Sequence, residues 1–445
     1  MNNTKLFQKD FLLVVIGQII SLFGNQILRF ALPLYLLNQT GSAALFGMIS
    51  AIAFIPMIVL CPIGGIIADR VNKRNIMVIL DFSTSAIVTV LCILLGKVDI
   101  VLLLLITMIL LYGIQGAYQP AVQASIPSLV PTQYIMPANA MINLVNSLSG
   151  LIGPVIGGAV YSLFGLTPIL YMSIICFFAS AFMEIFIHIP FHKQASQGNI
   201  FTIASHDLKE SFHYIRHEQP SIWQGSLLIA GINMFLSALI MIGLPIVVTQ
   251  TLSFEHVDAN RMYGYAQGAL AAGSLIGGMS AGALSKKLKA HHCPVILLLC
   301  TMTLFPIGLA LQFAKSTMIA YWIIVVSCFF MMLFAALFSI QMMAYLQMMA
   351  PKHLIGKIIS CAMCIGMCAS PLGQGMYGGF FQLMKAYPAV PFYFAGCVSI
   401  IITLASKRYS LLSPNCFRQR IKRCNYNTLI TTARMTAKVN RIVNI

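Results

Sequence analysis

The amino-acid sequence predicts an all-α membrane protein with twelve transmembrane helices in two pseudo-symmetric six-helix bundles. Of its 445 residues, 59% are hydrophobic and only 8% are charged, whereas a soluble domain carries about 25% charged residues. The apolar residues form continuous runs of about 20, the length that crosses a hydrocarbon core of about 30 Å as a helix. Continuous runs favour helices over a transmembrane barrel, whose strands alternate apolar and polar residues.

Each half of the chain contains six apolar runs, and one sizeable polar linker separates the halves. The first six are expected at residues 11–37, 43–68, 75–96, 99–122, 137–163 and 167–188. The second six are expected at residues 222–250, 261–284, 293–314, 317–346, 354–382 and 389–407. The predicted domains are an N-terminal bundle, a cytoplasmic linker, a C-terminal bundle and a basic cytoplasmic tail, at residues 1–188, 189–221, 222–407 and 408–445.

The two halves also resemble each other. Gly64 and Gly65 at the end of the second run have counterparts in Gly277 and Gly278 at the end of the eighth. Weak parallel duplication of this kind is typical of two bundles related by an axis along the membrane normal. We therefore expect a cavity between the bundles.

Lys and Arg residues fall mainly on one side of the predicted spans. With the N-terminus in the cytoplasm, the outer loops hold only Lys97, Arg261, Lys315 and Lys385. Because cytoplasmic loops carry the excess of Lys and Arg, both termini are expected in the cytoplasm. The basic tail contains no run long enough to span, so it is either a weak anchor for anionic lipid or a segment without a function of its own.

The formal net charge of +17 does not indicate nucleic-acid binding, because the basic residues form short clusters between spans rather than a basic face. The twelve cysteines lack the paired spacing of a zinc site or a disulfide framework. Cys361, Cys364 and Cys368 share one apolar span without a His or acid, which favours packing over metal binding. We expect no cofactor, no metal and no enzymatic activity; the expected partners are the lipid bilayer, a small-molecule substrate and protons, and the expected state is a monomer.

The loop after the second span contains the segment GGIIADRVNKR, residues 64–74. It resembles the signature of the major facilitator superfamily at this position, Gly-x-x-x-Asp-Arg-x-x-Arg/Lys-Arg/Lys. Small glycines let helix ends approach closely, and Asp69 can accept from a neighbouring helix N-terminus. The resemblance implies the major facilitator fold and a gating role for Gly65, Asp69, Arg70 and Arg74. The alternative is a charge cluster that only stops translocation.

The fifth span contains Gly150, Gly153, Pro154, Gly157 and Gly158. These residues resemble the Gly-Pro-x-x-Gly-Gly element typical of exporters in the same superfamily. Glycines at spacings of three and four form one smooth helix face, and the proline permits a bend. The resemblance implies a conformational role for Gly153, Pro154 and Gly157 in antiport, and the alternative is helix packing alone.

More narrowly, the N-terminal half resembles the branch of the superfamily that includes macrolide-efflux and enterobactin-exporter proteins. The stretches that carry this resemblance are Leu34–Ala43, Met77–Phe82 and Gln123–Pro131. The branch implies drug, macrolide-like or siderophore-like substrates, multidrug resistance and a bacterial inner (plasma) membrane. In the second half Gly282 and Ala283 replace Asp69 and Arg70, so a second gating loop of this kind is not expected.

Polar residues at helical spacing predict the wall of the cavity. Steps of three and four place Gln18, Ser21, Asn25 and Arg29 on one face of the first span, and other spans carry similar stripes. The candidate cavity residues are Gln18, Asn25, Arg29, Gln115, Gln119, Asn143, Asn233, Gln341 and Tyr345. Each could instead tie two helices together, at about 0.6 kcal/mol apiece. Together they indicate a hydrogen-bonding wall suited to amphiphilic organic molecules.

Three ionisable residues lie inside the predicted spans, where charge is costly. Asp81 and Glu184 lie toward cytoplasmic ends and are the candidates for proton coupling. Asp81 could instead pair with the nearby basic loop. Arg29 lies in the outer half of the first span, and its guanidinium either faces the cavity or extends to the outer membrane interface.

The sequence therefore predicts a secondary active exporter of small amphiphilic molecules that exchanges its substrate for protons by alternating access. One alternative keeps the fold and reverses the direction, as an uptake permease for a small organic solute. The other is a membrane receptor or scaffold that transports nothing.

Overall fold

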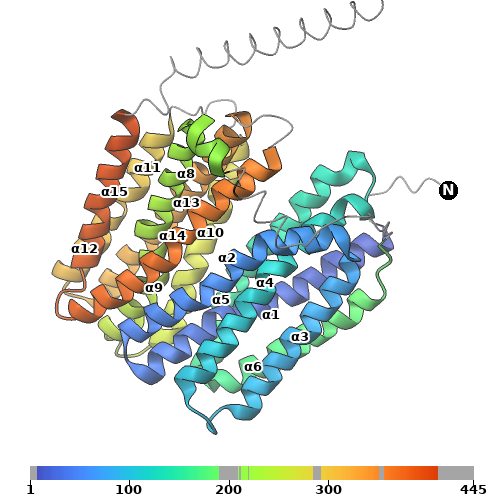
Figure 1. Cartoon of the computed structure of the whole chain (residues 1–445). Coiled ribbons are helices and arrows are strands. Elements are labelled where there is room, and N and C mark those ends of the chain that lie inside the picture. The colour runs from blue at the N-terminus through green and yellow to red at the C-terminus, as the bar shows by residue number, and fades with distance from the viewer. Residues whose placement is uncertain are drawn as a thin grey trace, which may run out of the picture.

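The computed structural model describes residues 8–189, 209, 212–218, 220–283, 292–349 and 355–408, and its helices form two groups (Figure 1). The basic tail after Arg408 and most of the predicted linker lie outside these residues. The first group contains α1 (Lys9–Thr40), α2 (Ala43–Arg70), α3 (Lys73–Leu94), α4 (Ile100–Leu129), a 3-10 turn η1 (Thr132–Tyr134), α5 (Ile135–Phe164) and α6 (Leu166–Ile185).

The second group begins after a π-helical turn, η2 (Tyr214–Glu218). The seventh predicted span is built from α8 (Pro220–Ile232), η3 (Asn233–Ser237), α9 (Ala238–Ile246) and η4 (Val247–Thr251), of which η3 and η4 are π-helical. The remaining helices are α10 (Ala259–Ala283), α11 (Cys293–Met302), α12 (Leu304–Phe313), α13 (Thr317–Met349), α14 (Ile355–Leu383) and α15 (Val390–Arg408). Single-turn π segments inside helices are frequent at functional sites, and η3 proves to lie beside the central cavity.

Within the described residues, nine helices are long and apolar enough to cross a membrane. Helices α10, α14 and α15 occupy the other predicted spans without meeting that criterion. α10 packs on α5 and α14 packs on α2, so part of the surface of each faces the other half rather than lipid. This explains why these two helices contain Gly and polar residues where a lipid-facing helix would be apolar.

The fourth predicted span ends too early. The span is predicted to end near residue 122, whereas α4 continues to Leu129. Gln123 is exposed, while Val122, Ile126 and Leu129 are buried in the core of the first group. The extra turns are therefore stabilised by burial of their apolar face, which outweighs one outward-facing polar residue.

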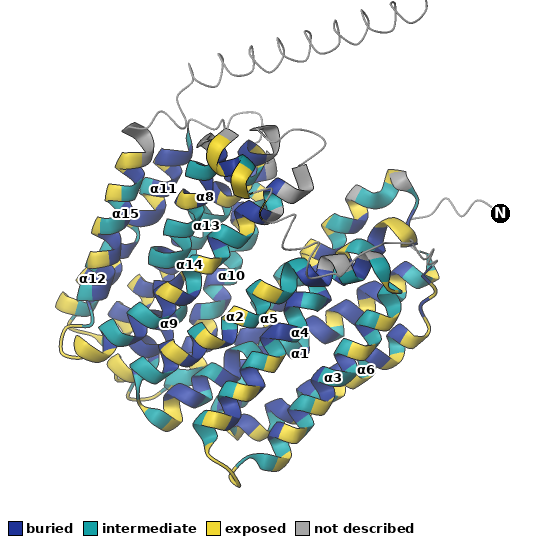
Figure 2. Cartoon of the chain, in the orientation of Figure 1, coloured by how far each residue is buried: buried dark blue, intermediate teal, exposed yellow. Residues whose placement is uncertain are grey.

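The surface of both groups is strongly apolar, as expected for contact with lipid. Phe178 is 56% exposed, Trp322 57% and Ile401 65%, and Figure 2 shows exposed positions along the outer faces of the helices. In water an apolar surface of this extent would be costly.

The two halves touch through two pairs of glycines. In α2 and α14, a Cβ added to Gly47 would lie 2.6 Å from the Cα of Gly378. In α5 and α10, a Cβ added to Gly158 would lie 2.9 Å from the Cα of Gly264. We call these four glycines the glycine clasp. Because no side chain intervenes, the helix backbones are in direct contact at both places.

Polar contacts accompany the clasp at the same end of the helices. Asn38 Nδ2 donates to Asn260 Oδ1 at 2.8 Å, and the backbone N–H of Ala43 donates to Gln382 Oε1 at 3.1 Å. These residues lie near the C-terminal end of α1, far from the N-terminus of the chain. Toward the side where the N-terminus lies, the two groups of helices diverge (Figure 1).

Candidate functional site in the central cavity

A cavity of about 590 Å³ lies between the two halves. Helices α1, α2, α4 and α5 form one wall, and α8 to α11 with α13 form the other. The polar lining residues are Gln26, Arg29, Ser50, Tyr112, Asn146, Ser147, Ser237, Tyr263, Gln267 and Ser274. Arg29 is the one charged residue among the lining residues that the structure describes.

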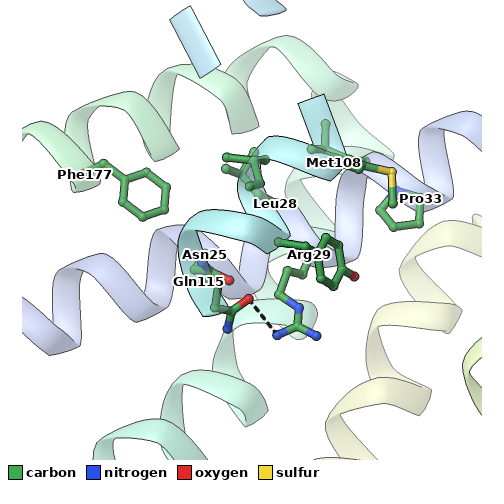
Figure 3. Close-up of a pocket in the computed structure, with 10 residues that line it drawn as sticks. Asn25, Leu28, Arg29, Pro33, Met108, Gln115 and Phe177 are labelled. Carbon is green, nitrogen blue, oxygen red and sulfur yellow. Dashed lines mark hydrogen bonds between the residues drawn. The ribbon is translucent and has the colours of Figure 1, made fainter. Parts of the chain in front are cut away.

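Arg29 reaches the cavity from α1 and is held by two residues of α4. Its Nη1 donates to Gln115 Oε1 at 3.1 Å, and its guanidinium carbon lies 5.0 Å from the centre of the Tyr112 ring. Figure 3 shows Arg29, Gln115 and Asn25 around a small hollow beside the main cavity. The guanidinium is thus directed into the cavity rather than toward the outer interface, and its remaining donors are available to a ligand.

The second wall has a different character. Its apolar lining residues include Ile240, Met241, Met331 and Met332, together with the thiol of Cys300. Methionine side chains are flexible and polarizable, so such a surface adapts to apolar groups of varied shape. The cavity therefore presents most of its polar residues and one positive charge on the N-terminal side. The C-terminal side presents a soft and mostly apolar surface, with Ser237, Tyr263, Gln267 and Ser274 as its polar residues.

Several candidate cavity residues lie elsewhere. Asn233 Nδ2 donates to the backbone oxygen of Gly366 at 3.1 Å, and Gln341 Oε1 accepts from the thiol of Cys293 at 3.2 Å. Tyr345 is 3% exposed. None of the three belongs to the described cavity lining, because their polar faces turn toward neighbouring helices.

Asn25 and Gln115 line the small hollow beside the main cavity. Gln18, Gln119 and Asn143 belong to neither described lining, so Arg29 alone among the candidates lines the main cavity. Gln18 is fully buried within the N-terminal bundle, where its amide bonds to Tyr118. Gln119 is half-buried and Asn143 is exposed, and neither belongs to the described lining.

Sequence patterns missed several lining residues. Gln26 lines the N-terminal wall, and Gln267 lines the C-terminal wall, where its amide donates to the hydroxyl of Tyr263 at 2.7 Å. Tyr263 in turn stacks on Phe30 with ring centres 4.9 Å apart. Gln26 directly follows Asn25 of the predicted stripe, so a wider arc of the helix would have included it.

The candidate gating residues lie at the junction of α2 and α3 and in α5. α2 extends through Gly65 and Asp69 to Arg70, but the surroundings of Gly65 and Asp69 lie outside what the structure describes. Arg74 donates from its guanidinium to the backbone oxygen of Ile185. A cation at the carboxyl end of a helix is favourable, so Arg74 joins the start of α3 to the end of α6.

The glycines of the fifth span contact both halves. A Cβ on Gly153 would lie 2.6 Å from the Cβ of Gln26, and one on Gly157 would lie 3.3 Å from the Phe30 ring. The backbone oxygen of Pro154 lies 2.8 Å from the position of a Cβ on Gly264. α5 is thus packed closely on α1 and on α10.

The candidate proton-coupling residues lie behind the cavity wall, within the N-terminal bundle. Tyr118 donates to Glu184 Oε1 at 2.9 Å, and Ser21 donates to Asp81 Oδ1 at 3.1 Å. Asp81 thus bonds to a hydroxyl of α1, and the pairing with the basic loop considered from the sequence is replaced by this contact. Asp81 and Glu184 are nearly or fully buried.

A helical membrane fold of two bundles around a central cavity defines the chain as a polytopic membrane transporter. It belongs to the major facilitator superfamily, because the model of that family matches residues 14–374.

Curated relatives include Macrolide efflux protein A. The protein of that name from Streptococcus pyogenes is 25% identical over 384 residues, which cover 83% of this chain and 90% of the relative. The one from Enterococcus faecalis is 22% identical over 340 residues, which cover 75% of this chain and 99% of the relative. These relatives confirm the resemblance of the N-terminal half to the macrolide-efflux branch.

Solved structures share the fold at low identity. A D-xylose-proton symporter superposes with a TM-score of 0.68 and 15% identity, covering 88% of this chain and 95% of that one. A bacterial homologue of the iron transporter ferroportin in its inward-facing state gives a TM-score of 0.67 and 15% identity, with coverage of 89% and 98%.

Proposed function

We propose that the protein is a secondary active exporter of small amphiphilic molecules, driven by proton antiport in the inner (plasma) membrane of a bacterium. The observation that carries the proposal is the cavity with two unlike walls. One wall offers Arg29, Gln26 and Asn146, and the other offers Met241, Met331 and Met332. A molecule with a carbonyl-rich or anionic side and an apolar side matches both walls at once.

The energetics favour such a ligand over a small sugar. A fully polar solute would leave the methionine wall without apolar contact, and a fully apolar one would leave the Arg29 donors without an acceptor. Burying apolar ligand surface contributes about 25 cal/mol per Å², and an unmatched buried donor costs about 1–3 kcal/mol. Both terms select a molecule with two faces.

The glycine clasp supports alternating access. With both termini in the cytoplasm, the clasp closes the outer end of the cavity and the diverging end faces the cytoplasm. This is the state in which an exporter binds its substrate from the cytoplasm. Release outside then requires the Gly47–Gly378 and Gly158–Gly264 contacts to open while the cytoplasmic ends close.

Export rather than uptake is supported by two observations. The relatives that match most of the chain carry the name macrolide efflux, and the fifth span carries the glycine and proline pattern of exporters. The symporter that superposes on the chain supports the fold alone and does not favour uptake.

Transport by inverted membrane vesicles tests the proposal. Vesicles from cells that express the chain should accumulate radiolabelled erythromycin when their lumen is acidified, and vesicles from cells without it should not. An uptake permease would instead empty preloaded inverted vesicles, and a scaffold would change neither flux.

A further inference from the structure

Two buried carboxyl groups belong to one polar cluster inside the N-terminal bundle. Asp81 of α3 is 2% exposed and Glu184 of α6 is fully buried. The hydroxyl of Tyr118, from α4, donates to Glu184 Oε1 at 2.9 Å, and Ser21 of α1 donates to Asp81 Oδ1 at 3.1 Å. Gln18, one turn before Ser21 on α1, donates to the Tyr118 hydroxyl at 2.6 Å. The two acids are thus members of one polar cluster.

The cluster contains more acceptors than donors. Asp81 Oδ2, Glu184 Oε2 and Gln18 Oε1 are buried and have no hydrogen-bond partner. All three atoms are acceptors in the ionised carboxyl or amide form. A proton on either carboxyl converts one acceptor into a donor, which can then bond to another member of the cluster. The hydrogen-bond pattern is therefore completed by adding a proton.

The charges around the cluster favour the same conclusion. In the described part of the chain, the hydrogen bonds to the two carboxyls come from the hydroxyl groups of Ser21 and Tyr118. α1 faces the cluster with the uncharged residues Gln18 and Ser21. Arg74 lies two turns before Asp81 on α3, and its guanidinium is bound to the backbone oxygen of Ile185. Two carboxylates buried together without a cation repel each other and lose hydration.

α1 connects this cluster with the cavity. Gln18 Nε2 donates to the Tyr118 hydroxyl at 2.6 Å, and Ser21 donates to Asp81. Asn25 and Arg29 follow on the same helix and line the hollow beside the cavity. Ser21 and Arg29 are eight residues apart, which is about 12 Å along a helix. A shift of α1 at one site therefore moves the other.

We propose that Asp81 and Glu184 form a single shared proton site, which acts on the cavity through α1 rather than by touching the substrate. The inference rests on the proposed antiport and deepens it. When the pair loses its proton, the two carboxylates repel and the contacts of α3, α4 and α6 with Gln18 and Ser21 change. Proton binding and substrate binding then oppose each other, and by reciprocity each weakens the other by the same factor.

The first test uses the purified full chain in proteoliposomes with erythromycin as the probe. In the wild type, erythromycin affinity should rise with pH by up to about tenfold per unit, the slope for release of one proton. Glu184→Gln and Asp81→Asn should each remove this slope and abolish transport driven by a pH gradient, while erythromycin exchange across the membrane continues. The double variant should lose no more than either single one, because the two acids form one site.

The control is Glu255→Gln, which changes an exposed carboxyl in an outer loop and should leave the pH slope and the driven transport unchanged. Retention of gradient-driven transport by Glu184→Gln, additive losses in the double variant, or a dependence on Na⁺ in place of pH would overturn the shared proton site.

A second measurement needs no substrate and no variant. An apolar carbodiimide reacts with protonated carboxyls, so mass spectrometry of the wild-type chain should find at most one adduct on Asp81 and Glu184 together, with a yield that falls as pH rises. Adducts on both acids of one chain, or a yield independent of pH, would overturn the proposal. If labelling behaves as expected and erythromycin is not transported, the result contradicts the proposed function for this probe and still supports the shared proton site.

Discussion

Replacing Gly378 by alanine should weaken the closure of the outer end of the cavity. The added Cβ would lie 2.8 Å from the backbone oxygen of Ala43 and 2.8 Å from the Cα of Gly47. Optimal separations between such atoms are about 3.5–4.0 Å, and both neighbours belong to the backbone. The two helices must therefore separate by about 1 Å to reach ordinary contact.

The size of the effect follows from the cost of overpacking, which is about 1–3 kcal/mol. Only the state in which α2 and α14 touch bears this cost, so the ratio of outward-closed to outward-open molecules should fall about 5- to 150-fold. Gly379 provides a matched control one residue away, because a Cβ there meets nothing within 4 Å. Gly379→Ala should leave the ratio unchanged.

The assay measures access to the cavity from outside. Ser274 lines the cavity, so a Ser274→Cys substitution in a cysteine-depleted chain reports when a membrane-impermeant maleimide can enter. Labelling from the outer side should accelerate with Gly378→Ala and remain at the parent rate with Gly379→Ala. Equal labelling rates in the two well-folded variants would refute the clasp as the outer closure.

Three further predictions concern the gate loop, the tail and the cavity. Asp69→Asn should cripple transport yet leave membrane insertion intact, because the loop loses its only carboxylate; wild-type rates in a normally expressed variant would end the assignment of this loop as a lock. Truncation after Tyr409 should leave transport largely unchanged, since the tail contains no apolar run long enough to span; loss of activity in a correctly inserted protein would show that the tail matters. Arg29→Ala should weaken binding of anionic or carbonyl-rich amphiphiles more than cationic ones, because only the former gain from the guanidinium donors; equal losses in a binding titration would remove Arg29 from the site.

The helical architecture could be predicted because crossing a bilayer imposes a length and a composition on each span. This holds even for α10 and α14, which face the other half and are less apolar than a lipid-facing helix, because both lie within two residues of the predicted bounds. The prediction was less accurate at the end of α4, whose last turns are held by burial of Ile126 and Leu129. Hydropathy indicates whether the surroundings of a helix are apolar or polar, and it does not identify which part of the protein is the neighbour.

The site was predictable in part for the same reason. Helical spacing placed Arg29 on a polar face, and the structure directs Arg29 into the cavity. On the same face, Asn25 lines the side hollow and Gln18 is buried against Tyr118. The same reasoning applied to Asn233 and Gln341 selected residues that bond to adjacent helices. A polar stripe in a membrane helix must avoid lipid, but spacing alone does not tell whether it faces a cavity or another helix. Contacts between distant segments, such as Gly47 with Gly378, leave no local pattern.

Proton movement driven by the substrate tests the central claim most directly. Proteoliposomes containing the purified chain are loaded with erythromycin and a pH-sensitive dye, then diluted into erythromycin-free buffer of the same pH. Antiport predicts that erythromycin leaving the lumen draws protons in, so the lumen acidifies whichever way the protein is inserted. Alkalinisation of the lumen would indicate cotransport in the same direction, and a constant pH would indicate no coupling; either result would contradict the proposed proton-driven export.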